Sequence, residues 1–408
     1  MNAKNEFVAA IDVAKGESMV SIISVYGEVI LEPTKYKHTL SDLNAIDQII
    51  KKEELVKKIT VFMESTSSYH YGIERFFDEA GYEVIVVNPN LVKKSSTTFR
   101  RTKTDPKDCY KIAHAYFKEE IKSNCLKSRD IYDDLTALNR QYLSIEKSAT
   151  ALKNRYTRLL DICIPEHEII HKNYKIKKFN IKYLNFFYEF PHSEIISNTR
   201  IDRLTNVLNS CFNRNYSSRM KIEATRIKEI LKDSFPGVSK DSTECNNLKQ
   251  TIRLLKQQLF ELDILKDEMI KLAKEIKYFE NINSIPGIGE LTTAQLIAEL
   301  KDINRFDNYK QINAYLGLEP SIYQSGKKCI YGKITKAGNR NGRKVLYTVV
   351  KNITLTSRKH YKDHPILLHY LKKKEKENKS EKESVISTTT KLIRIIFSLC
   401  KNNTTFIL

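Results

Sequence analysis

The stretch Ile59-Thr-Val-Phe-Met-Glu64 is a run of apolar residues that ends in a single acid. Short apolar runs rich in β-branched residues are typical of buried strands. Two similar runs are Phe7-Val-Ala-Ala-Ile-Asp12, which also ends in an acid, and Gly81-Tyr-Glu-Val-Ile-Val-Val87. A charge at the end of a buried strand is costly unless it is paired or bound to a metal. Asp12 and Glu64 are therefore candidate functional residues, with a turn at the strand end as the alternative.

Further predicted elements surround these strands. Residues 20–23 and 28–31 read as strands on either side of a Tyr-Gly turn, and residues 41–52 read as a helix. The serine-rich residues 65–68 resemble a helix start, followed by an amphipathic helix to about residue 80. This order of strands and helices predicts an α/β layer in which one sheet is covered by helices.

A second pair of acids lies in the basic stretch Arg101-Thr-Lys-Thr-Asp-Pro-Lys-Asp-Cys-Tyr110. Residues 93–129 contain eleven Lys or Arg and four Asp or Glu, two of which are Asp105 and Asp108. Residues three apart on a helix share one face, so a helix that starts at Pro106 would direct both carboxylates into one small volume. Asp-Pro-Lys-Asp is also a capping sequence, and taken alone the cap is the favoured interpretation.

The two acid pairs together suggest a metal site. Acids that converge repel one another and are normally retained because cations neutralise them. Two Mg²⁺ ions (or Mn²⁺) held by carboxylates can activate one oxygen and stabilise the leaving oxygen of a phosphodiester. The candidate metal ligands are Asp12, Glu64, Asp105 and Asp108.

The composition favours an intracellular protein that binds nucleic acid. The formal net charge is +20, and residues 326–380 contain sixteen Lys or Arg against three Asp or Glu, with tyrosines interleaved. This bias favours a polyanionic partner over a merely solvated face. The seven cysteines include no Cys-x-x-Cys pair, which indicates reduced thiols. With no signal sequence and no apolar run of about 18 residues, we expect a cytoplasmic protein without membrane contact.

The middle of the chain is predicted to be helical. Apolar residues from Leu135 to Leu159, and again from Leu248 to Ile276, recur at alternating spacings of three and four residues, as in a coiled-coil seam. Such helices pair either within one chain or with a second copy. Residues 166–247 between them read as several shorter helices to which no chemistry can be assigned.

Two glycine-rich stretches follow. Asn283-Ser-Ile-Pro-Gly-Ile-Gly289 resembles a helix-hairpin-helix, in which glycines let the backbone approach a phosphate; a bare turn between helices is the alternative. Further on, Ser325-Gly-Lys-Lys328 carries a candidate nucleophile; a serine that only hydrogen-bonds the backbone of a turn is the alternative. As a nucleophile it needs activation by a base or metal, and cations to hold the phosphate charge. The candidate nucleic-acid contacts are Lys103, Pro286, Gly287, Gly289, Lys327, Lys328, Lys336, Arg340 and Arg343.

Several motifs together resemble one known family. Ile-Asp-Val-Ala-Lys at 11–15, Met-Glu-Ser-Thr at 63–66, Val-Asn-Pro at 87–89 and Lys-Thr-Asp-Pro-Lys-Asp at 103–108 resemble the DEDD, RuvC-like (RNase H-like) domain of Piv/MooV-type transposases of bacterial insertion sequences. The Pro-Gly-Ile-Gly hairpin and the Gly-x-x-Pro…Ser-Gly motif resemble the C-terminal domain of the same transposases. Two residues depart from the family pattern: Ser67, where glycine is usual, and Cys109, where alanine is usual.

The resemblance implies a fold and a function. It implies a metal-binding tetrad of Asp12, Glu64, Asp105 and Asp108, and Ser325 as the nucleophile of a Mg²⁺-dependent DNA transposase or recombinase. It further implies DNA at the element end and target, a structured guide (bridge) RNA, a homodimer or homotetramer with a composite active site, and association with the nucleoid. The alternatives are a RuvC-type junction nuclease that uses water, a site-specific DNA invertase and a non-catalytic DNA-binding protein.

The expected fold is an α/β RuvC-like N-terminal domain, long coiled-coil-like helices and a mainly helical C-terminal domain with a helix-hairpin-helix. The expected division of the chain is 1–128 for the catalytic domain, 129–280 for the helical region, 281–360 for the C-terminal transposase domain and 361–408 for a basic linker and terminal helix. Within the last part, the Lys/Glu-rich run 372–383 is expected to be exposed and partly disordered.

Overall fold

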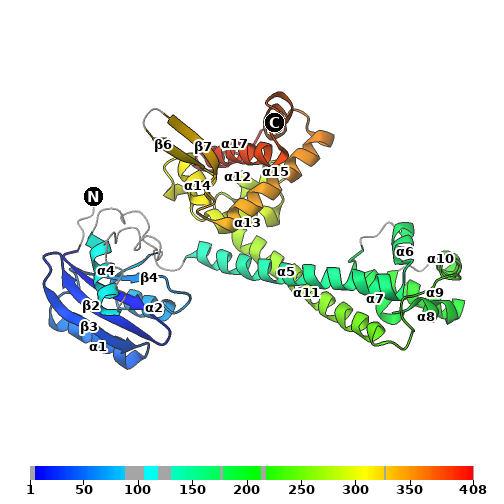
Figure 1. Cartoon of the computed structure of the whole chain (residues 1–408), viewed down its shortest axis with the longest axis horizontal. Helices are drawn as coiled ribbons and strands as arrows, with labels where there is room; N and C mark the ends of the chain where they lie inside the picture. The colour runs from blue at the N-terminus through cyan, green and yellow to red at the C-terminus, as the bar shows by residue number, and fades with distance from the viewer. Residues whose placement is uncertain are drawn as a thin grey trace. The chain divides into compact units, whose positions relative to one another are not determined.

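The computed structural model divides the chain into two compact units, Met1–Asp130 and Ile131–Leu408 (Figure 1). It describes residues 5–87, 105–117, 130–174, 178–212, 217–325 and 328–407. Each unit is described separately below. The four-part division expected from the sequence stays a prediction.

The first unit is built on one mixed five-stranded sheet with the strand order β3-β2-β1-β4-β5. β1 pairs antiparallel with β2 and parallel with β4, and β5 continues the parallel half. All five predicted strands are present. Their bounds are β1 (Phe7–Val13), β2 (Glu17–Ser24), β3 (Val29–Lys37), β4 (Ile59–Glu64) and β5 (Glu83–Val87).

Helices cover both faces of this sheet. Alternate residues of a strand point to opposite faces, and the buried residues of β1 divide accordingly: Ala9, Ile11 and Val13 pack in one hydrophobic cluster, and Val8 and Ala10 in another. The first cluster includes residues of α1 (Leu40–Lys52) and α2 (Tyr71–Glu79), and the second includes residues of α4 (Asp105–Phe117).

The prediction of a helix start at residues 65–68 was wrong in position. Helix α2 begins at Tyr71. Ser67 has a φ of +51°, in the left-handed region, and the backbone N–H of Ser65 donates to the carbonyl of Val87 at 2.8 Å. A residue in that conformation turns the chain and does not belong to a right-handed helix, so these serines form the turn that precedes α2.

The second unit begins with two long helices packed against each other, α5 (Ile131–Cys163) and α11 (Thr243–Lys274) (Figure 1). They run antiparallel, because Leu135 near the start of α5 shares a cluster with Met269 near the end of α11, while Tyr156 and Leu159 share another with Leu248. The predicted apolar positions are buried or half-buried in this pairing within one chain. The supercoil of a true coiled coil stays a prediction.

Shorter helices fill the segment between α5 and α11, as the sequence predicted. Their aromatic residues, such as Tyr183, Phe186 and Phe187, pack around the buried Tyr156 of α5. The bounds are α6 (His167–Tyr174), α7 (Ile181–Glu189), α8 (Ser193–Asn198), α9 (Ile201–Phe212) and α10 (Ser217–Ile230).

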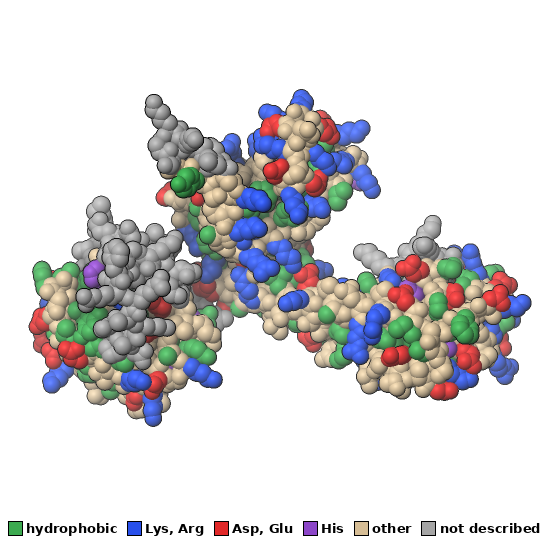
Figure 2. All heavy atoms as spheres, in the orientation of Figure 1, with side chains coloured by type: hydrophobic (Ala, Val, Ile, Leu, Met, Phe, Trp, Pro, Cys, Tyr) green, Lys and Arg blue, Asp and Glu red, His purple; other side chains and the backbone are tan. Residues whose placement is uncertain are grey.

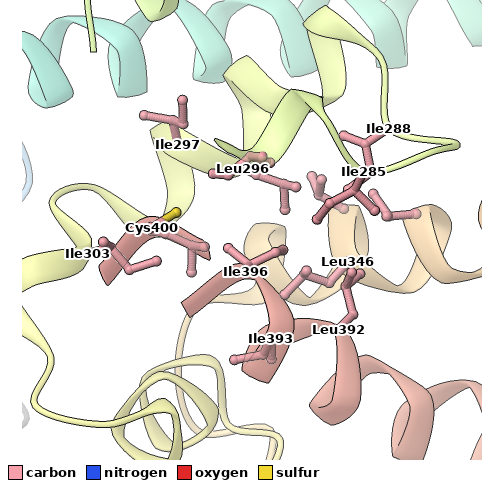
Figure 3. Packing of buried hydrophobic residues seen from close by; sticks show 14 of the residues in the cluster. Ile285, Ile288, Leu296, Ile297, Ile303, Leu346, Leu392, Ile393, Ile396 and Cys400 are labelled. Carbon is pink, nitrogen blue, oxygen red and sulfur yellow. The ribbon is translucent and has the colours of Figure 1, made fainter. Parts of the chain in front are cut away.

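The C-terminal part of this unit is mainly helical and carries one two-stranded sheet, β6 paired with β7. Isoleucines and leucines of several helices form its core, to which Ile285, Leu296, Leu346, Ile396 and Cys400 belong (Figure 3). The bounds are α12 (Phe279–Asn283), α13 (Glu290–Leu300), η2 (Ile303–Arg305), α14 (Tyr309–Leu316), β6 (Pro320–Ser325), β7 (Lys328–Ile334), α15 (Arg340–His360), α16 (Pro365–Leu371), η3 (Lys372–Lys376) and α17 (Glu381–Asn402).

The Lys/Glu-rich run expected to be partly disordered is instead ordered. It forms the π-helical turn η3 and the first residues of α17. Ion pairs of 2.7 Å between Lys373 and Glu377 and of 2.6 Å between Lys374 and Glu381 connect the charges, and Ser380 caps α17 in a capping box. Opposite charges four residues apart stabilise a helix, and the same composition also occurs in a solvated coil. Composition alone therefore did not distinguish an ordered segment from a disordered one.

Candidate active site

Asp12 and Glu64 occupy neighbouring positions at the carboxyl ends of two parallel strands. The register pairs Ile11 of β1 with Met63 of β4, and the two acids are the next residue on each strand. Adjacent strands lie about 4.8 Å apart. Ala10 and Phe62, two residues before each acid, pack in the hydrophobic cluster that includes residues of α4. Since side chains two residues apart on a strand point to the same face, both half-exposed carboxylates lie on the face that α4 covers.

Helix α4 is docked so that its first turn lies at this same edge of the sheet. Near its start, the buried thiol of Cys109 donates to the carbonyl of Ala10 at 3.1 Å and lies 3.2 Å from Ser21 Oγ. Near its end, the hydroxyl of Tyr116 is 2.9 Å from Thr60 Oγ1, close to the amino end of β4. The helix therefore runs antiparallel to the two strands, which brings its first turn to Asp12 and Glu64.

The structure thus brings the described acids to one edge of the sheet. Asp108 is in the first turn of α4, and its Oδ1 accepts a hydrogen bond from Lys111 Nζ at 2.6 Å. Asp105 begins the helix, but its side chain lies outside the described residues. Burial, together with the nearby negative charge of Asp12, raises the pKa of the Cys109 thiol to about 11, so the thiol stays protonated and donates.

The donor chemistry fits a hard divalent cation, because Mg²⁺ and Mn²⁺ prefer carboxylate oxygens. Among the side chains that the structure describes, however, no three His, Cys, Asp or Glu lie close enough together to hold an ion. Asp105 is not among these side chains, and Oδ1 of Asp108 is paired with Lys111. Metal binding by Asp12, Glu64, Asp105 and Asp108 therefore stays a prediction.

Ser325 lies at the end of strand β6, opposite Lys328 at the start of β7. The side chains of both residues, and all of Gly326 and Lys327, lie outside the described residues, as does Lys103. Ile322 and Tyr323 of the same strand are 59% and 68% exposed. These exposures show that this part of strand β6 is in contact with solvent.

The base of the hairpin is fixed by close backbone contacts. Lys336 N donates to Gly317 O at 3.0 Å and Asn339 N donates to Tyr315 O at 2.9 Å. Gly317 (φ +63°) and Gly338 (φ +147°) have backbone angles that favour glycine, and a Cβ on either would collide with the opposite backbone. The glycines of this stretch therefore hold the two ends of the hairpin together.

Not all the predicted cations are equally accessible. Arg343 Nη1 donates to the carbonyl oxygens of Leu316 and Gly338 at 2.7 and 3.2 Å, which gives it a structural role at the base of the hairpin. Lys336 and Arg340 are exposed. Lys336 lies in the loop between β7 and α15, and Arg340 is the first residue of α15.

The Pro-Gly-Ile-Gly stretch is a turn between α12 and α13. Gly287 (φ +93°) faces Ile353 of α15, and a Cβ there would lie 3.0 Å from the Ile353 side chain, so its backbone angle and its packing both favour glycine. Gly289 precedes α13 and has open space around it. The first residue of α13, Glu290, forms a 2.5 Å ion pair with Lys274. Phosphate binding by Pro286, Gly287 and Gly289 stays a prediction.

The sequence reasoning missed a buried carboxylate. The side chain of Glu299 in α13 is fully buried and accepts hydrogen bonds from Arg140 at 2.5 and 3.0 Å, from Asn139 at 2.7 Å and from Asn339 at 2.8 Å. It connects α5 to the residue that caps α15. The available signal was a lone acid in the apolar helix sequence Thr-Ala-Gln-Leu-Ile-Ala-Glu-Leu300, because buried acids are kept only when paired.

Comparisons with known proteins show the family of the chain. Residues 9–165 match a family described as Transposase, of the IS110 DEDD type, and residues 279–364 match the Transposase IS116/IS110/IS902 family. The first range covers the acid-bearing sheet and the second covers the hairpin with Ser325. The chain belongs to the IS110-type DEDD transposase family.

Curated relatives carry names of the same class. The chain is 34% identical over 95 residues to the transposase for insertion sequence element IS1111A of Coxiella burnetii, a match that covers 22% of this chain and 26% of that protein. It is 25% and 24% identical over 157 residues to the pilin gene-inverting proteins of Moraxella lacunata and Moraxella bovis, covering 38% of this chain and 47% of each relative. The chain thus spans less than half of the length of these relatives.

Among the helices of the described ranges, none combines the length and the apolar composition that a membrane span requires.

Proposed function

We propose that the chain is a DNA transposase or recombinase that cuts and rejoins strands through Ser325, assisted by Mg²⁺ or Mn²⁺ at Asp12, Glu64, Asp105 and Asp108. The observation that carries the proposal is the register of Asp12 and Glu64 beside the first turn of α4. Carboxylates at one edge repel one another, and a bound cation would neutralise that repulsion. When bound, the ions supply Lewis-acid stabilisation of the charge that develops on phosphodiester oxygens.

The proposed reaction conserves phosphodiester bonds. The Ser325 oxygen attacks a DNA phosphorus, a phosphoserine bond forms, one P–O bond of the DNA breaks, and the departing deoxyribose oxygen takes up the proton that the serine loses. A deoxyribose hydroxyl of the partner strand then attacks the same phosphorus, the P–O bond to Ser325 breaks, and the serine oxygen takes up the proton that the hydroxyl loses. Exposed cations such as Lys336 and Arg340 hold the phosphate during both steps.

The direct test is a search for a covalent adduct. Protein purified together with its bound RNA is mixed with element-end DNA and Mg²⁺, and the products are separated on a denaturing gel. We expect an adduct with the native chain and with Ser321→Ala, a control on the same strand, but none with Ser325→Ala or Asp12→Asn. DNA that is cut without an adduct, equally in the native chain and in Ser325→Ala, would show a RuvC-type nuclease that uses water.

A second candidate, site-specific inversion, is favoured by the names of the Moraxella relatives. Inversion and transposition share the chemistry proposed above and differ in the DNA that is joined. A plasmid with two inverted target sites distinguishes them: inversion of the intervening segment supports the second candidate, and excision or insertion of the element supports the first.

The guide RNA and an assembly of two or four copies belong to the proposal through the family resemblance, and nucleoid DNA would be the site of action. Extraction of RNA from the protein purified without nuclease, followed by sequencing, tests the guide. A single RNA species encoded beside the gene is the expected result. A random mixture of cellular RNA would contradict it.

A further inference from the structure

Helix α15 presents a face without any acidic residue. From residue 320 to residue 362 the chain contains eleven Lys or Arg and no Asp or Glu. Over this part of the second unit, blue Lys and Arg side chains gather on the face shown in Figure 2. The opposite side of α15, which includes Leu346, Val350 and Ile353, is buried in the core, so packing determines which side faces solvent.

Three cations lie along one line of this exposed face. Lys344, Lys351 and Arg358 are all exposed and follow one another at intervals of seven residues. Seven residues make close to two turns of an α-helix, so the three side chains point in nearly the same direction, about 10.5 Å apart along the axis. The exposed Leu355, at 61%, lies between the last two.

The length of this row suits a regular polyanion. Duplex DNA carries one negative charge per about 1.7 Å of its axis when both strands are counted, so about twelve phosphates lie along the roughly 21 Å that the three cations span. A helix laid against the duplex therefore crosses phosphates of both strands, which long lysine and arginine side chains can contact. Helix α15 itself contributes no acid that would repel the backbone, and Leu355 is suited to contact with deoxyribose.

Intramolecular contacts leave these cations available. Lys344 has a long ion pair with Glu146 at 3.9 Å, and Arg358 lies 5.9 Å from the ring of Tyr370. Lys351 interacts electrostatically with Glu381, but that acid already accepts hydrogen bonds from Lys374 at 2.6 Å and Tyr370 at 2.5 Å. Exposed pairs of this kind contribute less than about 1 kcal/mol, so they do not compete strongly with phosphate.

An ordinary solvated helix in the same chain differs from α15. Helix α10 exposes Lys221 and Arg226, but its sequence also contains Glu223 and Glu229. Charges of both signs are typical of a helix whose polar face meets only water. The absence of acids over the whole length of α15 is therefore not required for solubility.

We propose that Lys344, Lys351 and Arg358 form a docking surface for the phosphate backbone of duplex DNA, outside the residues that carry the reaction. This inference rests on the proposed function, since it assumes a DNA substrate. It adds a surface that holds the duplex independently of its sequence, because phosphate contacts fix position without reading bases.

The salt dependence of binding tests this surface. The dissociation constant for a labelled duplex DNA of random sequence is measured in EDTA over a series of KCl concentrations. Each lost phosphate contact lowers the slope of the logarithm of the dissociation constant against the logarithm of the KCl concentration by about 0.9. The triple variant Lys344→Gln/Lys351→Gln/Arg358→Gln is therefore expected to lower this slope by about 2.7. The matched control Lys221→Gln/Arg226→Gln/Lys232→Gln removes equal charge elsewhere and should leave the slope nearly unchanged.

Three results would overturn the proposal: an unchanged slope in the α15 variant, an equal loss in the control, or a loss seen with duplex RNA but not with duplex DNA. The charge-retaining variant Lys344→Arg/Lys351→Arg/Arg358→Lys should keep the native slope, which separates charge from folding defects. Because EDTA prevents metal-dependent cleavage, this result is independent of the covalent-adduct test, and either proposal can fail alone.

Discussion

Ser67 shows what one backbone angle does beside the acidic edge. It follows Glu64 by three residues and has a φ of +51°. In the sequence, Ser67 departs from the glycine that is usual in the family at this position. The left-handed backbone angle explains why glycine suits the position. A left-handed conformation costs an L-residue about 1–2 kcal/mol, whereas glycine adopts it freely.

The stability of variants at Ser67 follows from this angle. Ser67→Val is expected to lower the free energy of unfolding by about 1 kcal/mol, because β-branched residues tolerate the left-handed region least. Ser67→Gly is expected to be at least as stable as the native chain, since the relief of strain offsets the greater freedom of its unfolded state. Urea denaturation measures both. A valine variant as stable as the native chain would contradict the observed turn.

Cys400 gives the C-terminal core a pH dependence. Burial raises the pKa of its thiol to about 12, so the folded state favours the neutral form. The resulting stabilisation is complete below pH 9, the ordinary range of a thiol, and is lost as the pH rises toward 12. We expect the free energy of unfolding to fall by about 2 kcal/mol more between pH 8 and pH 11 in the native chain than in Cys400→Ala.

The comparison of the two pH profiles isolates this thiol, because other buried tyrosines and cysteines titrate in both proteins. The Ala variant starts from a lower stability, since it leaves a cavity beside Ile303 and Ile396 (Figure 3). Only the difference in slope is diagnostic. Parallel profiles would mean that the thiol of Cys400 meets solvent.

At the scale of elements, Glu299 connects three segments that are distant in sequence. Glu299→Ala would leave Arg140, Asn139 and Asn339 without their shared acceptor, and we expect it to destabilise the second unit by about 3 kcal/mol. Glu290→Ala, in the first turn of the same helix, breaks only an exposed ion pair and should cost less than about 1 kcal/mol.

Hydrogen exchange localises the effect of the Glu299 change. Amides of residues 336–343 and of the first turns of α5 should exchange faster in Glu299→Ala. The amides of α9 should be unaffected, because α9 packs in the separate hydrophobic cluster around Tyr156. Equal protection in both variants would contradict the role assigned to Glu299.

The spacing of apolar residues predicted the strands and helices that are buried on one face or on all sides. The strands of the first unit and the seams of α5 and α11 follow directly from the spacing of apolar residues. Composition gave wrong predictions where the same residue types occur in more than one backbone conformation. Residues 65–68 form a turn instead of a helix start, and residues 372–383 are ordered instead of partly disordered.

The candidate site was predictable only in part. Asp12, Glu64 and Asp108 could be proposed because acids beside apolar strands or in a basic stretch are unusual. Glu299 and the structural role of Arg343 depend on partners 159 and 27 residues away, which no local pattern specifies.

At the scale of the whole molecule, catalysis should separate from binding. The net charge of the chain is +20, and most of its lysines and arginines take no part in the proposed reaction. Asp105→Asn and Ser325→Ala are therefore expected to abolish strand exchange while the affinity for duplex DNA and its salt dependence stay within about twofold of native. Filter binding and strand-exchange assays on the same preparations measure both. A large loss of binding in either variant would contradict the roles of these residues.

The antiparallel pairing of α5 and α11 also limits how the length of this chain can evolve. A residue added to one helix alone would rotate every later apolar position by about 100° away from its partner. Seven residues added to both helices at facing positions would restore the seam and carry the module of α6–α10 about 10.5 Å farther along it. Insertions and deletions in related genes should therefore occur as matched pairs of heptads, one on each side of residues 166–242.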